Sequence, residues 1–341
     1  MVKTVFRAYR IEKPGAHPGA ALWGRFVDMD ESVLDAGDVL VHVSHSAVGA
    51  RDAAAARGEG VRRLPCVGGD GLAGVVVASA APRFAPGMRV AALGHELGLA
   101  HHGGYAEKAL LPGGWVLPLP DDMSARDAMA IGTAGLAAAM AITRLEENGL
   151  RAERGPVLVT GASGGVGSLA VDMLAARGYE VVALTGRVEA RERLLAQGAA
   201  RVMLREALDP RACEPLDRGW WAGAIDVLGG DWLGWLLATT KPAGAVASVG
   251  NVAGAPFAAT TLPFARRGIS LVGVDTVHGG FAMRERAWQR IAGDLRPRHL
   301  AHYVREVEFG ALPDVFADFE AGLASGRTVV RLTSGREKDT K

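Results

Sequence analysis

The stretch Pro156-Val-Leu-Val-Thr-Gly-Ala-Ser-Gly-Gly-Val-Gly-Ser168 combines a short apolar run with a cluster of glycines. The run 157–159 is typical of a fully buried strand, and a helical pattern follows from Leu169 to Ala176. Glycines between a strand and a helix let the backbone approach a pyrophosphate, which the N–H groups at the helix start can bind. The stretch therefore predicts a dinucleotide site rather than a tight packing turn.

The segments around this stretch alternate between strand and helix patterns. Strands are predicted at 157–160, 180–184, 201–204, 224–228, 244–250 and 269–274, and helices at 167–177, 188–196, 232–239 and 283–295. Such alternation predicts a parallel, doubly wound sheet. Upstream of it, Ser124 is a predicted helix N-cap with the acidic Asp127 in the first turn, and helical patterns follow at 127–131 and 133–145.

The first third of the chain has a different sequence pattern. Short apolar or alternating runs such as 38–43, 74–78 and 87–93 read as strands, and prolines and glycines separate them. Since no long helical pattern interrupts residues 6–117, we predict a mostly β domain. The segments 305–309 and 327–332 return to a strand pattern, and we expect them to rejoin this first domain.

Composition narrows the class of protein. The 341 residues are enough for two domains, and 49% apolar with 22% charged residues is ordinary for a soluble globular chain. A net charge of +1 gives no electrostatic case for nucleic acid or an anionic membrane as a partner. Two cysteines, Cys66 and Cys213, exclude a disulfide framework. Charges near the N-terminus do not fit a signal peptide, so we expect a cytoplasmic protein without a membrane segment.

The end of the second predicted strand bears on the choice of nucleotide. An acidic residue there commonly binds the ribose hydroxyls of NAD. Here Tyr179-Glu-Val-Val-Ala-Leu runs into Thr185-Gly-Arg187, without a carboxylate at the strand end. The planar guanidinium of Arg187 suits a phosphate, and Thr185 adds a hydroxyl. The segment favours NADP(H) over NAD, unless Arg187 is only a solvated charge that starts the next helix.

Motifs along nearly the whole chain resemble those of one superfamily. They are Phe6-Arg-Ala, Gly37-Asp-Val, Arg62-Arg-Leu-Pro, Pro82-Arg-Phe-Ala-Pro-Gly, Gly103-Gly-Tyr-Ala-Glu, Ala128-Met-Ala-Ile-Gly-Thr-Ala-Gly135, Gly155-Pro-Val-Leu-Val-Thr-Gly-Ala-Ser-Gly-Gly-Val-Gly, Leu184-Thr-Gly-Arg and Arg284-Glu-Arg-Ala-Trp. In this respect the chain resembles the medium-chain dehydrogenase/reductase superfamily, and within it the zinc-free quinone oxidoreductase and acrylyl-CoA reductase branch.

The resemblance implies a two-domain α/β architecture. A GroES-like catalytic domain, residues 1–125 completed by 297–341, would pack on a Rossmann-type doubly wound parallel sheet, residues 126–296. The active site would lie in the interdomain cleft, and the family commonly forms homodimers through the edge strands of two Rossmann sheets.

The cofactor site follows from the glycine turn, the end of the second strand and the resemblance together. The residues expected to bind NADP(H) are Thr133, Ser163, Gly164, Gly165, Val166, Thr185, Gly186, Arg187, Val249, Gly250 and Asp275. The resemblance alone contributes Thr133, the loop 249–252 and the segment 273–275, each of which could also be a plain turn.

No metal site is expected. Relatives that bind catalytic zinc carry a Cys near the position of Gly49 and a His-Glu pair near Asp70, and this chain has neither. A second group, His95-Glu96 with His101-His102, does not have the spacing of a helical zinc motif, because glycines break the stretch. We interpret it as a loop at the rim of the active site.

The substrate side departs from the zinc-free relatives. They usually carry Asn-Tyr-Lys-Asp where this chain reads Gly49-Ala-Arg-Asp52, and often Tyr where it has Leu136. The candidate acids or anchors are Arg51, Asp52, His95 and Tyr105, and the candidate substrate contacts are Gly49, Ala50, His102 and Leu136. Asp52 fits a structural partner that caps a turn. Arg57, Arg62 and Arg63 could meet the phosphates of a CoA thioester.

These observations lead to one main hypothesis about function. The chain would be a zinc-independent, NADPH-dependent reductase that transfers hydride to an activated C=C of a small molecule, such as an enoyl thioester, an enone or a quinone. Because Asn and Tyr are missing, two alternatives stay open. One is a non-catalytic NADPH-binding accessory or sensor protein, and the other is a biosynthetic reductase with a bulkier, atypical substrate.

Overall fold

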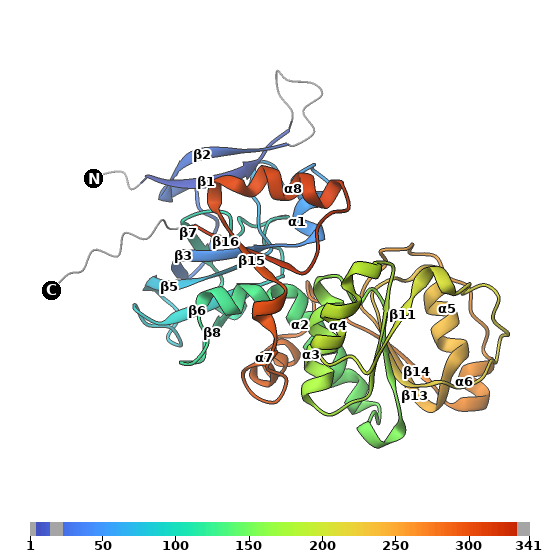
Figure 1. The fold of residues 1–341 in the computed structure, drawn as a ribbon. Coiled ribbons are helices and arrows are strands. Elements are labelled where there is room, and N and C mark those ends of the chain that lie inside the picture. Colours follow the sequence, from blue (N-terminus) through green and yellow to red (C-terminus); the bar gives the residue numbers. More distant parts are fainter. Residues whose placement is uncertain (1–4, 14–22, 333–341) are drawn as a thin grey trace. The chain divides into compact units, whose positions relative to one another are not determined.

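The computed structural model describes residues 5–13 and 23–332 (Figure 1). The chain divides into two compact units, one reaching to Thr133 and resuming at Val304, the other comprising Ala134–Tyr303. We call them the β-rich unit and the parallel-sheet unit. The boundaries predicted from the sequence, after residues 125 and 296, lie a few residues before these. The first four residues, on which the signal-peptide expectation partly rests, lie outside the described residues.

The β-rich unit contains two sheets, one with three strands in the order β2-β1-β4 and one with seven, in which β15-β16-β3-β5-β6-β8 are neighbours and β7 also pairs with β3. Its elements are β1 (Val5–Ile11), β2 (Gly24–Asp30), β3 (Val39–Val48), α1 (Ala50–Ala55), β4 (Cys66–Val67), β5 (Gly71–Ser79), β6 (Arg89–Leu93), β7 (Lys108–Leu111), β8 (Val116–Pro118), β15 (Val304–Glu308), α8 (Leu312–Glu320) and β16 (Arg327–Arg331). The prediction of a mostly β domain is confirmed. The tail rejoins this unit, because β16 pairs antiparallel with β3.

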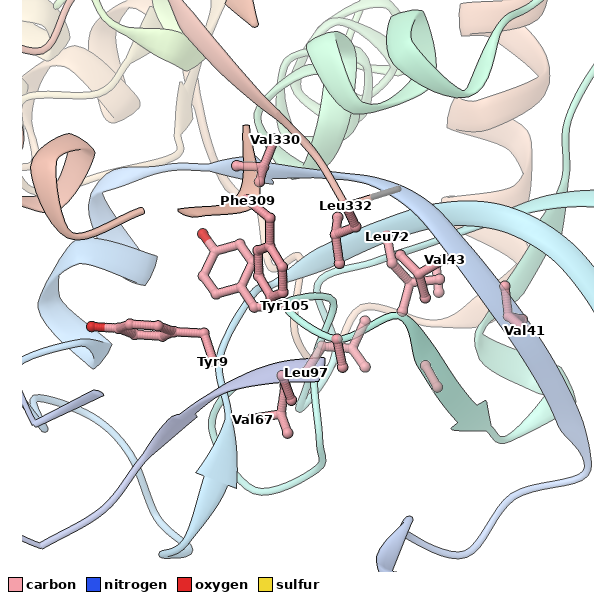
Figure 2. Close-up of a cluster of buried hydrophobic side chains, with 14 of the residues drawn as sticks. Tyr9, Val41, Val43, Val67, Leu72, Leu97, Tyr105, Phe309, Val330 and Leu332 are labelled. Carbon is pink, nitrogen blue, oxygen red and sulfur yellow. The ribbon is translucent and has the colours of Figure 1, made fainter. Parts of the chain in front are cut away.

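The core of the β-rich unit explains why its strands form. Along β3 the side chains of Val39, Val41 and Val43 are buried, whereas His42 between them is exposed, as expected for a strand with one face on the core. Figure 2 shows Tyr105 and Phe309 among the side chains of this core, and the ring of Tyr105 lies 6.1 Å from that of Phe316 on α8. Aromatic side chains of this size bury a large apolar area, and they hold the tail against the N-terminal strands.

The parallel-sheet unit is built around one six-stranded sheet in the order β11-β10-β9-β12-β13-β14, with every neighbouring pair parallel. Its elements are β9 (Val157–Val159), α3 (Gly165–Ala176), β10 (Val181–Thr185), α4 (Arg191–Ala196), β11 (Arg201–Leu204), β12 (Trp221–Asp226), α5 (Gly230–Thr239), β13 (Thr240–Ser248), α6 (Leu262–Arg267), β14 (Ser270–Gly273) and α7 (Phe281–Ala292). Helices α3, α4, α5 and α6 each connect one parallel strand to the next (Figure 1). The predicted Rossmann-type sheet is confirmed.

Some predicted element ends require correction. The predicted strand 224–228 ends at Asp226, because the N–H groups of Val227 and Leu228 bond to the side-chain oxygen of Thr160 instead of to a neighbouring strand. The predicted helix 283–295 is α7, which ends at Ala292 because Gly293 follows with a non-helical backbone. The first turn of the predicted helix 188–196 is a tighter 3₁₀ turn, 188–190.

Helix α2 (Ala125–Glu147) contains both helical patterns of the sequence. The Ser124 hydroxyl accepts the N–H of Asp127 at 3.0 Å, as expected of an N-cap. Gly132 breaks the helix, with φ of 54° and ψ of −160° that only glycine adopts readily. By length and apolar composition α2 could cross a membrane, but 83% of its most apolar window is buried inside the protein, as in the core helix of a globular domain.

Candidate functional site

The glycine turn after β9 packs backbone against backbone. Gly161 has φ of +58°, and a Cβ on Gly167 would lie 2.3 Å from the carbonyl oxygen of Gly161. Helix α3 begins at once, with Gly164 as its N-cap. The N–H groups in the first turn of such a helix have no acceptor within the helix, and they carry its positive dipole end. A glycine-rich turn that ends in these donors fits a dinucleotide pyrophosphate.

The sheet changes direction beside this turn. From β9 the chain runs outward through β10 and β11, and it then returns to β12 on the other side of β9. The Thr160 hydroxyl donates to Asp226 Oδ1 at 2.7 Å, which joins the ends of β9 and β12. Asp226 also accepts the N–H groups of Leu228 and Gly229. Open parallel sheets bind their ligands at this kind of reversal.

The predicted residues at the end of β10 lie together. Thr185 donates its hydroxyl proton to Ser163 Oγ at 2.9 Å, and it accepts the N–H of Arg187 at 3.1 Å. Arg193 from α4 donates to the carbonyl oxygen of Ser163. Burial lowers the pKa of the Arg193 guanidinium, and the like charge of Arg187 lowers it further, whereas Tyr303 acts in the opposite direction.

A third arginine borders the same place. The guanidinium of Arg205 would lie about 3.2–3.4 Å from a Cβ on Gly186. Arg193 and Arg205 therefore flank the segment 185–187, which itself carries Arg187. We call the three arginines the basic corner: Arg187, Arg193 and Arg205. Sequence reasoning identified only Arg187. The pairing of Thr185 with Leu204 across β10 and β11 is what brings Arg205 to Gly186.

The ends of β13 and β14 line an open pocket of about 600 Å³. Its lining includes three residues predicted to bind the cofactor, Val249, Gly250 and Asp275, together with Arg144, Ser248, Asn251, Gly273 and Val274. Arg144 of α2 was not predicted, and it donates to the carbonyl oxygen of Gly273 at 2.7 Å. Asp275 accepts the N–H groups of Val277 and His278, which lower the pKa of its carboxyl group, so its side chain is fixed as the cap of a turn.

In the β-rich unit, the segment 49–52 forms the start of α1 and faces the residues before β5. Asp52 is buried and accepts two N–H groups, from Gly49 at 2.9 Å and from Asp70 at 2.8 Å. Arg51 Nη2 lies 3.3 Å from Asp70 Oδ2. The Asp70 carbonyl in turn accepts the Thr133 hydroxyl at 3.3 Å. Asp70, which was not among the predicted site residues, thus connects Arg51, Asp52 and Thr133.

The other substrate-side candidates are more constrained. Tyr105 is 1% exposed and donates its hydroxyl proton to the carbonyl of Ala47, and burial raises the pKa of that hydroxyl well above its usual range. This position does not favour Tyr105 as a proton donor. His102 is buried, and its Nδ1 accepts the N–H of Val67 at 3.1 Å, while burial lowers its pKa. His102 is therefore held as a neutral ring.

His95 belongs to the β-rich unit, and Leu136 belongs to the parallel-sheet unit. His95 has φ of +53°, which is strained for a non-glycine residue, and its ring stacks on Trp115 at 4.8 Å. Backbone strain of this kind is often found at functional sites. Leu136 is fully buried on α2. Gly49 is half-buried and Ala50 is exposed.

The three arginines considered for CoA phosphates are each paired with a carboxylate. Arg63 donates to both oxygens of Asp35, Arg62 pairs with Glu96, and Arg57 lies 2.9 Å from Glu59. A phosphate would have to displace these carboxylates. The structure therefore gives no particular support to a CoA-phosphate site at these positions.

The charge of Asp52 yields a prediction about stability. Burial, and then the neighbouring Asp70 carboxylate, raise the pKa of Asp52 to about 8, against about 3.9 in an unfolded chain. Between these values the native protein holds a proton that the unfolded chain has lost, so stability falls as pH rises from about 4 to 8. Asp70→Asn removes the like charge, lowers the pKa of Asp52 and should make this fall shallower.

The measurement is the midpoint of urea unfolding at pH 5 and pH 8. We expect the loss between the two values to be smaller in Asp70→Asn than in the wild type. Asp121→Asn, at an exposed position, should keep the wild-type loss. Equal losses in all three proteins would show that Asp70 does not act on Asp52.

Comparison with known proteins identifies the family of the chain. Residues 35–121 match the alcohol dehydrogenase GroES-like domain, and residues 157–226 match the NAD dependent epimerase/dehydratase family. The chain is 42% identical to the acrylyl-CoA reductase AcuI of Ruegeria pomeroyi, over 87% of this chain and 91% of the relative. It is also 42% identical to the putative quinone oxidoreductase YhfP of Bacillus subtilis, over 86% of this chain and 90% of the relative.

Two solved structures are similar over most of their length. The yhdH oxidoreductase from Salmonella enterica, in complex with NADP, has a TM-score of 0.90 at 37% identity, covering 96% of this chain and all of that one. YhfP of Bacillus subtilis, with NAD bound, has a TM-score of 0.91 at 40% identity, with the same coverage.

The chain belongs to the medium-chain dehydrogenase/reductase superfamily, in its zinc-free quinone oxidoreductase and acrylyl-CoA reductase branch. It is an oxidoreductase. Within the described parts of the chain, no group of three or more His, Cys, Asp or Glu side chains could hold a metal ion.

Proposed function

We propose that the protein is a zinc-independent, NADPH-dependent reductase that transfers hydride to the activated C=C of an α,β-unsaturated carbonyl compound. The observation that carries the proposal is the basic corner beside the glycine turn. Three arginines around the segment 185–187 fit the 2′-phosphate that distinguishes NADPH from NADH. When bound, the cofactor would supply the hydride.

The proposed cofactor contacts are distributed along the parallel-sheet unit. The turn 161–167 and the start of α3 would hold the pyrophosphate, and the basic corner would hold the 2′-phosphate. The pocket at the ends of β13 and β14 would take a further part of the cofactor, as the resemblance implies for the loop 249–252. One relative was crystallised with NADP and another with NAD, and the test of this proposal therefore compares NADPH with NADH.

The substrate would meet the segment 49–52. Reduction of a conjugated C=C needs a reactant held in the correct orientation and a donor at the carbonyl oxygen, where negative charge develops. Arg51 is a donor at this segment, whereas Ala50 has no group that could serve. The neutral, backbone-bound His102 and the buried Tyr105 would shape the site without moving a proton.

The test is a substrate panel assayed with NADPH and NADH in parallel. It contains enals, enones, quinones and acrylyl-CoA, and it follows cofactor oxidation. We expect turnover with at least one conjugated carbonyl compound and a preference for NADPH. Tight NADPH binding without any turnover would instead favour the non-catalytic accessory or sensor protein.

A second candidate, a reductase with a bulkier substrate, is favoured by the space at Gly49. A Cβ built there meets only Asp52 Oδ2, at 3.5 Å, among described atoms within 4 Å. Ala50 beside it is exposed. Ala50→Tyr, which introduces the side chain common in relatives, should lower turnover of long or branched enones more than that of methyl vinyl ketone. Equal effects on both would argue against the bulkier substrate.

We also propose that the protein forms a homodimer through β14, which is an edge strand of its sheet. Exposed apolar side chains lie on this strand, where Leu271 is one, and on α6, where they include Leu262 and Phe264. Gel filtration with light scattering should give twice the chain mass of 35.5 kDa. Leu271→Lys should shift the protein toward the monomer, and a wild-type monomer at micromolar concentration would contradict the proposal.

A further inference from the structure

Arg51 carries hydrogen-bonding capacity that the fold does not use. Its Nε and Nη2 are buried, and neither has a hydrogen-bond partner among the residues that the structure describes. The nearby Asp70 Oδ2 lies 3.3 Å from Nη2, longer than the roughly 2.7–2.9 Å of a strong charge-assisted hydrogen bond. A buried charged donor without an acceptor is unfavourable, and native proteins seldom keep one without a function.

The charges around Arg51 restrict what it can bind. Asp70 lies against its guanidinium, and Asp52 is buried beside Asp70. The Asp70 carboxylate offsets the positive charge of Arg51, so a multiply charged phosphate gains little there. A single oxygen that accepts one or two N–H groups satisfies the donors without bringing a large negative charge close to Asp70.

The Arg51 side chain as a whole is 29% exposed, so a ligand can approach it from solvent. Gly49 has no side chain, and Ala50, the residue before Arg51, is exposed. The N–H of Gly49 is bonded to Asp52, which fixes the backbone that carries Arg51. The ligand oxygen would therefore meet a partly exposed side chain on a fixed backbone.

We infer that Arg51 binds the carbonyl oxygen of the unsaturated substrate, with Asp70 as its positioning residue; the inference rests on the proposed reductase function. During reduction the hydride adds to the β-carbon, and the π electrons of the C=C move toward the carbonyl oxygen, which becomes an enolate. Hydrogen bonds from Arg51 strengthen as this negative charge grows. A proton from solvent then adds to the α-carbon and restores the carbonyl, so Arg51 keeps its own protons throughout.

The kinetic test compares Arg51→Met and Arg51→Lys with the wild type, using NADPH and methyl vinyl ketone. Arg51→Met should lower kcat/KM by about 100-fold, as expected for the loss of one donor at a developing oxyanion. Arg51→Lys keeps the charge and should lose less, about tenfold. Arg25→Met, at an exposed site on β2, is the matched control and should retain wild-type activity. Retention of wild-type kcat/KM by Arg51→Met would overturn the inference.

A binding measurement separates this inference from the proposed function. Crotonate, an unsaturated carboxylate, is titrated into protein saturated with NADP⁺, and tryptophan fluorescence reports the affinity. The wild type should bind crotonate, and Arg51→Met should bind it at least tenfold more weakly. As controls, all variants should bind NADPH with the same affinity and should have the same circular dichroism spectrum. Failure of the wild type to bind crotonate, or equal binding by Arg51→Met, overturns the role of Arg51. Crotonate binding that depends on Arg51, without turnover of any panel compound, would reject only the reductase function.

Discussion

Replacement of Arg187 by Glu is expected to lower kcat/KM for NADPH by roughly 1,000-fold and to change that for NADH by less than about threefold. A charge-assisted hydrogen bond to a phosphate contributes about 1.5–3 kcal/mol, and each 1.4 kcal/mol is about tenfold. Reversing the charge removes this attraction and adds repulsion between the carboxylate and the 2′-phosphate. Since NADH lacks that phosphate, kcat/KM for NADH should change little.

The position of Arg187 makes this the sharpest test of cofactor choice. Its N–H is fixed on the hydroxyl of Thr185, directly at the end of β10. Arg191→Glu makes the same charge change at an exposed position on α4, and it should alter neither cofactor's kinetics by more than about threefold. Steady-state kinetics with both cofactors gives the comparison. Equal losses for NADPH and NADH in Arg187→Glu would show that Arg187 does not select the phosphate.

Gly167→Ala should reduce stability and cofactor binding together. The added Cβ would lie 2.3 Å from the carbonyl oxygen of Gly161 and 2.7 Å from Cα of Ala162. Both are backbone atoms, so the turn itself must move. Overpacking of this kind costs about 3 kcal/mol of unfolding free energy at its upper range. Because the moved turn carries the N–H donors for the pyrophosphate, we expect NADPH affinity to fall by roughly 100-fold.

Gly164→Ala provides the matched stability control in the same turn. Its Cβ would lie 3.3 Å from the Gly161 oxygen, and its φ of −82° suits any residue. We expect a stability loss of less than about 1 kcal/mol. Urea unfolding and titration of NADPH fluorescence measure the two effects. If Gly167→Ala were as stable as Gly164→Ala and bound NADPH normally, the close packing of the turn would not matter.

The fold was predictable where one local pattern decides a strand or a helix end. The run 157–159 has no exposed side chain, and it lies in the middle of the parallel sheet as its unbroken apolar character indicates. Ser124 and Gly132 mark the start and the break of α2 through ordinary capping and glycine chemistry. The start of β13 was harder to predict. Ala243 has φ of +52° within that strand, and its pairing with β12 shifts register there.

The candidate site was predictable only in part, for a similar reason. Arg187 lies two residues after the end of β10 in the sequence, so its position could be inferred. Arg205 approaches Gly186 only through pairing of β10 with β11, and Asp70 meets Arg51 from a different element. Tyr105 is the opposite case, a residue that the sequence suggested as a candidate acid and that the structure does not favour in that role. A tyrosine in a glycine-rich motif looked like a possible acid, but its ring and hydroxyl are buried in the core.

The central claim, that the protein reduces a conjugated C=C with NADPH, is tested most directly by isotope transfer. A stoichiometric amount of NADPH carrying deuterium at both C4 positions is mixed with the protein and methyl vinyl ketone, and the product is analysed by mass spectrometry and NMR. We predict butanone with one deuterium on the carbon that was β to the carbonyl. Formation of the unsaturated alcohol, or butanone without deuterium at that carbon, would contradict the claim.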